Sequence, residues 1–138
     1  MSDDQVFCKE AKSLNKVEIN LIPISNKESG IKMGIFPLSP TRALIVESRR
    51  VTKFSCTTPT ERNGVLVYSL DLTLGNGQDF LSALLPAGRN SQEVATCNGV
   101  TSGIHFNELL KQGDFIMFEG IKVELIKQGK FDKVVITK

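Results

Sequence analysis

The sequence predicts a mainly β fold, a five-stranded Greek-key barrel with one short helix between the third and fourth strands. Three observations predict it. From residue 42 onward, apolar and polar side chains alternate with a period of two, as in strands with one wet face. Gly, Asn and Pro gather between these runs, where turns form. A single segment in this part of the chain has apolar residues near helical spacing, so the order of elements is strand, strand, strand, helix, strand, strand.

The first three strands of the predicted barrel lie between residues 42 and 86. Residues 42–55 mix β-branched and charged side chains and form the first strand. Residues 65–74 form the second strand. Its predicted core face consists of Leu66, Tyr68, Leu70, Leu72 and Leu74. A Gly-Asn-Gly turn then leads into residues 78–86, so the second and third strands are predicted to be antiparallel neighbours.

The remaining elements of the predicted barrel follow a polar connection. Residues 87–102 are rich in Gly, Asn, Ser and Thr and favour a surface loop. Residues 104–113 carry the helical spacing and end in a glycine, which is a common helix terminator. Residues 114–126 are predicted to form the fourth strand, with a bulge or bend at Gly120. Residues 131–138 form the fifth.

Residues 1–41 are predicted to form an N-terminal arm on a barrel domain that spans residues 42–138. Within the arm, residues 16–24 alternate like a strand. We expect them to add an edge strand to the barrel or to complete the sheet of another subunit. The second arrangement would make the protein a homo-oligomer. The alternative for the arm is a leader outside the fold, because glycines and prolines interrupt its second half.

Targeting signals and cysteines bear on the compartment. The chain lacks the basic start and apolar run of a secretory signal, and no window reaches the roughly 18 apolar residues of a membrane span. Its three cysteines are odd in number and far apart, which favours free thiols in a reducing compartment. We therefore expect an intracellular protein of the cytoplasm, the nucleus or an organelle, or a phage-encoded one, with no membrane contact.

No cluster of residues points to a reaction, so we expect neither an enzyme, nor a metal site, nor a cofactor. His105 is the lone histidine and has no obvious partner for base catalysis or for a zinc site. Asp71 and Asp79 flank the predicted hairpin turn, where aspartates usually cap. Gly75 and Gly77 lack the following Lys-Ser/Thr pair and the helix of a phosphate-binding loop.

Charge is distributed unevenly along the chain, although 17 basic and 15 acidic side chains leave a net charge of only +2. Residues 42–53 hold four basic and one acidic side chain, and residues 122–138 hold five and two. In the predicted barrel the first strand lies between the fourth and the fifth. The two stretches, each +3, are therefore expected to form one basic stripe, which would suit a polyanionic partner.

A resemblance to a known family rests on the order of elements and on three stretches, RRVTKF, GNGQDF and KQGDFIMFEG. Residues 42–138 resemble single-stranded nucleic-acid-binding proteins of the oligonucleotide/oligosaccharide-binding (OB) barrel family at the level of topology. The resemblance implies a groove across the second and third strands, bordered by the loops at residues 56–64 and 128–130. It implies a protein that binds single-stranded DNA, or else RNA, without catalysis.

Single-strand binding requires cations for phosphates and flat rings for bases. The candidate binding residues are Arg49, Arg50, Lys53, Phe54, Arg62, Phe80, Lys122, Lys130 and Phe131. A solvated charged face explains each cation singly, and a phenylalanine is more often a core residue. Two other classes of function stay open, a docking subunit with this fold and an oligomeric structural β protein. The sequence leaves the choice between DNA and RNA, the sequence preference and the oligomeric state open.

Overall fold

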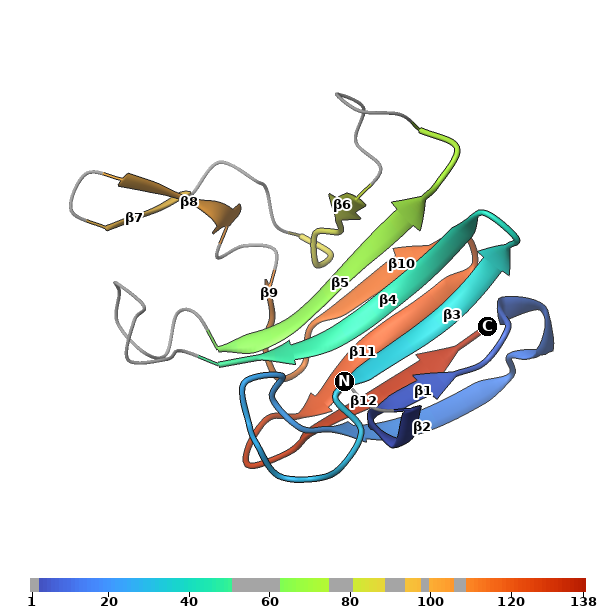
Figure 1. Ribbon diagram of the computed structural model, residues 1–138, viewed down its shortest axis with the longest axis horizontal. Coiled ribbons are helices and arrows are strands. Elements are labelled where there is room, and N and C mark those ends of the chain that lie inside the picture. Colours follow the sequence, from blue (N-terminus) through green and yellow to red (C-terminus); the bar gives the residue numbers. More distant parts are fainter. Residues whose placement is uncertain (1–2, 51–62, 75–80, 89–93, 98–99, 106–108) are drawn as a thin grey trace.

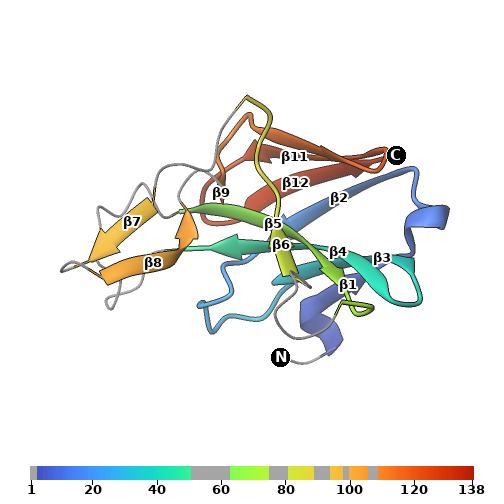
Figure 2. The same cartoon turned by 90° about the horizontal axis from the view of Figure 1, so that it is seen from above.

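Two β-sheets stacked face to face form the body of the protein in the computed structural model (Figure 1). The structure describes residues 3–50, 63–74, 81–88, 94–97, 100–105 and 109–138. Figure 2 separates the layers, with β11, β12 and β2 on one side and β5, β4 and β3 on the other. The chain is mainly β, as the alternating runs predict. Within the described ranges, no helix is long and apolar enough to cross a membrane.

The first sheet has the strand order β1-β3-β4-β5-β6, and β9 adds to β5. Its strands are β1 (Val6–Cys8), β3 (Met33–Ser39), β4 (Arg42–Arg49), β5 (Gly64–Asp71), β6 (Leu81–Ala83) and β9 (Leu109–Leu110). β1 runs parallel to β3, and the other neighbours are antiparallel. The predicted antiparallel pairing of the second and third strands is confirmed by the β5–β6 pair, in which Leu70 lies opposite Leu81.

The second sheet is fully antiparallel and has the order β10-β11-β12-β2. Its strands are β10 (Phe115–Phe118), β11 (Ile121–Lys127), β12 (Asp132–Thr137) and β2 (Lys16–Leu21). A separate hairpin joins β7 (Val94–Cys97) to β8 (Val100–His105), and two short 3-10 turns cover Asp3–Gln5 and Ala11–Ser13. Residues 16–21 therefore form an edge strand, on β12, where the sequence predicts an added strand.

The core lies between the two sheets, where alternate side chains of strands such as β11 and β12 point inward. On β11, Val123 and Leu125 are fully buried, whereas their neighbours Lys122 and Glu124 are half-buried on the outer face. The first sheet contributes Phe36, Leu44, Val46, Val65 and Val67, all fully buried. Each such side chain contributes about 1.5–3 kcal/mol when it leaves water. The packing of these two inner faces therefore dominates the stability of the fold.

β4 contacts the opposite sheet at both of its ends through arginine side chains. At its start, Arg42 Nη2 lies 2.7 Å from Glu119 Oε1 in the β10–β11 turn, and hydrogen bonding to this carboxylate raises the pKa of Arg42. Just beyond its end, Arg50 Nη2 lies 2.5 Å from Asp132 Oδ1 at the start of β12. The sheets are therefore held together by polar contacts at both ends of the sandwich as well as by the core.

Strand pairing differs from the predicted barrel. β4, which corresponds to the predicted first strand, pairs with β3 and β5 and not with β11 or β12. Neither of the two large sheets closes on itself through the described strands, so the five-stranded Greek-key barrel is not confirmed. The reason is that β3 occupies the edge of β4 that the barrel would need for closure. β3 lies within residues 1–41, and its Pro37 is accommodated next to a register shift.

The helix predicted over residues 104–113 is wrong for the part of it that the structure describes. β8 extends to His105, and Leu109–Leu110 forms β9, which pairs with Val65 and Leu66 of β5. Two adjacent leucines suit a buried strand as well as a helix, and here both are buried against β5. Pairing with the sheet has overridden the helical spacing.

The predicted fourth strand is a hairpin rather than one strand. Phe118 pairs with Ile121, which leaves Glu119 and Gly120 as a two-residue turn. Both residues have positive φ, 49° and 82°, as the tight turns that suit a twisted hairpin require. Gly120 therefore marks a reversal of the chain, where the sequence predicts only a bulge or bend.

The core face of β5 is opposite to the predicted one. Val65 and Val67 point between the sheets and are fully buried. Of the predicted core face, Leu66 is buried, but Leu72 and Leu74 are 63% and 37% exposed beyond the end of the strand. Both faces of this strand are apolar near its start, so alternation alone cannot identify the face that meets the second sheet.

Candidate nucleic-acid interface

Two turns and the end of β4 meet at one end of the sandwich, which we call the basic end. It comprises residues 22–32 between β2 and β3, residues 47–50, and residues 127–132 around the β11–β12 turn. The registers that pair Met33 with Glu47 and Leu21 with Asp132 bring these segments to the same end. Six cationic and three anionic side chains give this end a net charge of +3. More than the whole net charge of the protein is therefore concentrated here.

Arg50 and Asp132 anchor the β11–β12 turn to the end of β4. Arg50 donates from Nη2 to Asp132 Oδ1 at 2.5 Å and from Nη1 to Oδ2 at 2.8 Å, a bidentate pair. It also donates to the carbonyl of Gly129 at 2.9 Å. Asp132 and Ser48 are both fully buried, and the Ser48 hydroxyl donates to Asp132 at 2.6 Å. A buried carboxylate is tolerated because these donors satisfy it, and the turn is thereby fixed in place.

Phe131 presents its ring to solvent from this anchored turn. The residue is 45% exposed, although phenylalanine usually belongs to the core. Lys130 Nζ lies 5.7 Å from the centroid of the ring, within cation–π range. On the other side of the turn, the Gln128 N–H donates to Gln112 Oε1 at 3.0 Å. An exposed flat ring with a cation beside it therefore stands on a turn whose backbone is held on both sides.

Arg49 belongs to a second polar group on the outer face of the first sheet. Its Nη2 and Nε lie 2.5 and 2.7 Å from Oε1 of Glu47, which is 2% exposed. The hydroxyl of Tyr68 donates to Glu47 Oε2 at 3.4 Å. Burial, followed by the negative charge of Glu47, raises the pKa of Tyr68 to about 12. Tyr68 is therefore a protonated donor to a buried carboxylate, and Arg49 retains part of its guanidinium surface at the rim.

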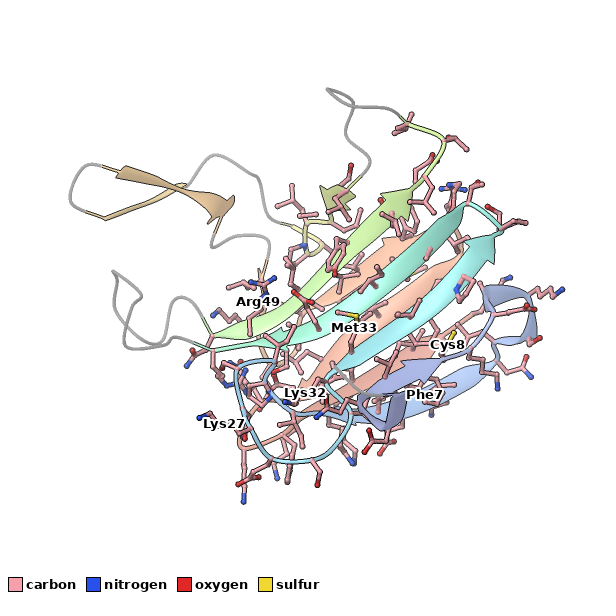
Figure 3. All side chains as sticks on the ribbon, viewed as in Figure 1. Phe7, Cys8, Lys27, Lys32, Met33 and Arg49 are labelled. Atoms are coloured by element: carbon pink, nitrogen blue, oxygen red, sulfur yellow. The ribbon has the colours of Figure 1, made fainter. Side chains whose placement is uncertain are left out.

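The loop between β2 and β3 adds cations to the same end. Figure 3 shows Lys27, Lys32 and Arg49 on the same side of the molecule. Lys32 is buried and its ammonium donates to the carbonyl of Asn26, whereas Lys27 is exposed. The Asn26 side chain in turn accepts from the Glu28 N–H at 2.8 Å. The loop backbone is thus held by its own hydrogen bonds, which leaves Lys27 to solvent.

The structure brings together four of the nine residues predicted to bind nucleic acid. These are Arg49, Arg50, Lys130 and Phe131, at the basic end. Lys122 lies near the opposite end, on the outer face of the second sheet, where it contacts Glu124 at 3.3 Å and lies 5.0 Å from the Phe115 ring. The others, Lys53, Phe54, Arg62 and Phe80, lie outside the described residues.

The predicted binding residues omit Lys27, Lys127 and Asp132, on which the basic end depends. Lys27 and Lys127 are exposed cations, and Asp132 is the anchor of Arg50. Lys27 lies in the segment interpreted as an arm, so its proximity to β12 follows only from the β2–β12 pairing. The partner of Arg50 lies 82 residues away in sequence, and no local pattern indicates it.

Asp71, which flanks the predicted hairpin turn, has a structural explanation. Asp71 accepts hydrogen bonds from the Thr73 hydroxyl at 2.6 Å and the Thr73 N–H at 3.0 Å, which lower its pKa. It therefore caps a turn, while Asp79 lies outside the described residues. No three His, Cys, Asp or Glu side chains within the described ranges come together as metal ligands. A hollow of about 520 Å³ lies far from the basic end, beside Glu10, Lys12 and residues 37–40.

No protein-family model, curated protein or solved structure matches the chain. The geometry of the basic end and the sequence therefore carry the functional argument on their own.

Proposed function

We propose that the protein binds single-stranded nucleic acid, DNA in the first place, through its basic end and without catalytic activity. The observation that carries the proposal is the exposed Phe131 ring beside Lys130, on a turn that Arg50 anchors. Proteins that bind single strands without sequence preference combine stacking rings with cations that follow the phosphates. Both components stand together at this end.

The cations divide into two groups by what they already contact. Lys27, Lys127 and Lys130 make no ion pair among the described residues and are exposed, so their ammonium groups suit phosphate contacts. Arg50 already donates hydrogen bonds to Asp132 and to the carbonyl of Gly129. Its role is therefore to hold the turn that carries Phe131. The proposal needs no closed barrel, because the turns of an open sandwich present these groups equally well.

The test is a fluorescence-anisotropy titration with single-stranded and duplex DNA and RNA at two salt concentrations. Three phosphate contacts give a log–log salt slope of about −2 for a single strand. Lys127→Ala together with Lys130→Ala should flatten that slope by about 1.4. Lys12→Ala is the matched control, because this lysine is 81% exposed and lies on the distant 3-10 turn. Equal affinity for single strands and duplex at about 50 mM salt would contradict the proposal.

Phe131→Ala separates stacking from charge. A stacked base contributes about 1–3 kcal/mol, so this change should weaken binding by about 5- to 150-fold at every salt concentration. The ring is already 45% exposed, so the thermal unfolding midpoint should change little. Unchanged affinity of the variant would exclude the ring from the interface.

A protein-docking function is the second candidate, because exposed leucines gather where β5 ends and β6 begins. Leu72 and Leu81 are 63% and 50% exposed, and Leu81 lies opposite Leu70 in the sheet. Apolar side chains in such a group commonly mark a protein contact. A partner complex whose affinity does not change with salt, together with no affinity for single strands, would favour this function.

A further inference from the structure

β2 ends the second sheet and has an unusual edge. It contributes six residues, contains no proline, and pairs with β12 without a register shift. The other edge strands of the two large sheets are shorter, with four residues in β10, three each in β1 and β6, and two in β9. Proteins usually blunt an exposed edge by short length, proline, a bulge or an inward-pointing charge. β2 has none of these four features, and its inward side chains Val17, Ile19 and Leu21 are apolar. Its edge carries charge only on the exposed side chains of Lys16 and Glu18.

The register shows which backbone groups of β2 face outward. The carbonyl of Asn15 accepts from the Lys138 N–H at 2.9 Å, toward β12. Backbone groups alternate between the two sides along a strand, so Val17, Ile19 and Leu21 also point toward β12. Lys16, Glu18 and Asn20 therefore direct their N–H and C=O groups away from the sheet, and within the described chain no strand pairs with that side.

We propose that β2 pairs antiparallel with β2 of a second copy of this chain, about a two-fold axis at Val17. In this register Lys16 lies opposite Glu18 of the second copy, and Glu18 lies opposite Lys16 of the second copy. The two opposed pairs lie within residues 16–18 of each copy and supply about four backbone hydrogen bonds, because residues of even number carry the outward groups. The two four-stranded sheets then form one continuous sheet.

Charge complementarity selects this register over its neighbours. A two-fold axis at Glu18 would place the two Glu18 carboxylates opposite each other, and like charges at directly opposed positions destabilise a sheet. An axis at Ile19 would pair Glu18 with Asn20 and leave Lys16 without an acidic partner. In the single chain Lys16 is exposed and forms no ion pair with any described residue, whereas Glu18 contacts Lys133 at 2.9 Å. The axis at Val17 gives Lys16 the acidic partner that it lacks.

The first test is sedimentation velocity of the full chain without nucleic acid, from about 1 to about 500 µM. We expect a reversible shift from 15.2 kDa to twice that mass. In a dimer of either variant, Lys16→Glu or Glu18→Lys, both opposed pairs of residues 16 and 18 carry like charges. Each change should therefore weaken the dimer about tenfold or more. An equimolar mixture of the two variants should recover dimerisation, because the mixed pair again opposes unlike charges. Lys12→Glu, on an exposed lysine outside β2, is the matched control and should dimerise normally.

Glu18→Pro tests the backbone contribution. It removes an N–H that faces away from β12, so the ladder to β12 stays intact while the edge is blocked. The variant should stay monomeric up to the highest concentration with an unchanged far-ultraviolet circular dichroism spectrum. If it fails to fold, the mixing experiment alone decides. Wild-type protein that is monomeric at all concentrations, or a dimer that Lys16→Glu does not weaken or that the mixture does not recover, would overturn the proposal. Because no nucleic acid is present, these outcomes are independent of the proposed function.

Discussion

The ion pair between Arg50 and Asp132 is the most informative contact to remove. Asp132→Ala deletes a carboxylate that accepts two hydrogen bonds from Arg50 and one from Ser48. The same change removes two of the three hydrogen bonds that Arg50 donates to residues 129–132 and leaves the one to the carbonyl of Gly129, so the β11–β12 turn is held less firmly to the end of β4. The perturbation therefore affects the stability of the fold and the position of Phe131 together.

The cost can be estimated from burial. Removing one partner of a buried ion pair costs about 3–5 kcal/mol of unfolding free energy. Arg50 is 18% exposed and can regain water when Asp132 is removed, so Asp132→Ala should fall near the lower value. Arg50→Met leaves the fully buried Asp132 without its cation and should fall near the upper value. The double variant Arg50→Met with Asp132→Leu should cost only about 1–2 kcal/mol, mainly because the Ser48 hydroxyl loses its acceptor.

Urea unfolding followed by circular dichroism measures these differences. For a small protein the slope is about 1–3 kcal/mol per molar urea, so a loss of 3 kcal/mol lowers the midpoint by about 1–3 M. Glu10→Ala is the control, because its ion pair with Lys12 is exposed on both sides and should contribute less than about 0.5 kcal/mol. If Asp132→Ala costs less than about 1 kcal/mol, or if the double variant loses as much stability as Asp132→Leu and Arg50→Met lose separately and in sum, the two side chains are not coupled as described.

Two further predictions concern alkaline pH and a close backbone contact. Tyr68 is the sole tyrosine and the chain has no tryptophan, so tyrosinate absorbance follows this residue alone, with a midpoint expected near pH 12. Because its folded pKa is raised above the unfolded value of about 10, stability is full below pH 10 and falls by about 1–2 kcal/mol as the pH rises toward 12. Tyr68→Phe should remove that fall, and a native midpoint near pH 10 would contradict the contact with Glu47. Gly64→Ala would place a Cβ 2.6 Å from the Leu110 carbonyl oxygen and should cost about 1–3 kcal/mol in urea unfolding, because backbone must move. Gly129→Ala meets nothing closer than 3.9 Å and should change stability by no more than about 1 kcal/mol; equal effects of the two changes would count against the β5–β9 contact.

Alternation along the chain was sufficient to predict where several strands lie. Residues 16–21 and 42–49 form strands within the predicted runs, and β5 and β6 have the antiparallel pairing that the sequence predicts. Alternation was not sufficient to assign faces or partners. Val65 and Leu66 are adjacent and both buried, so only packing against the second sheet decides which of them faces the core. The two-residue turn at Glu119 and Gly120 separates β10 from β11. The sequence could not indicate this turn, because a β-bulge has nearly the same sequence pattern.

The sequence predicts the candidate site only where the residues that form it are neighbours along the chain. Lys130 and Phe131 are adjacent in a turn of polar residues, so a cation beside an exposed ring is a local property of the chain. The role of Arg50 is not local, because the sequence shows a cation but not the buried Asp132 that binds it. Lys27 reaches the same end only through long-range strand pairing. Surface cations therefore divide into anchoring and free groups on the basis of tertiary contacts alone.

The anchoring of the β11–β12 turn lowers the entropic cost of any contact that the turn makes. A partner that orders a loose loop must offset the lost conformational freedom of every residue in it, about 1–2 kcal/mol for each backbone unit. Here Gly129 and Gln128 are already held by Arg50 and Gln112. Only the side chains of Lys130 and Phe131 are left to be ordered, at about 0.5–1.5 kcal/mol for a long side chain. A surface as small as this turn can therefore contribute measurable affinity, because folding has already ordered its backbone.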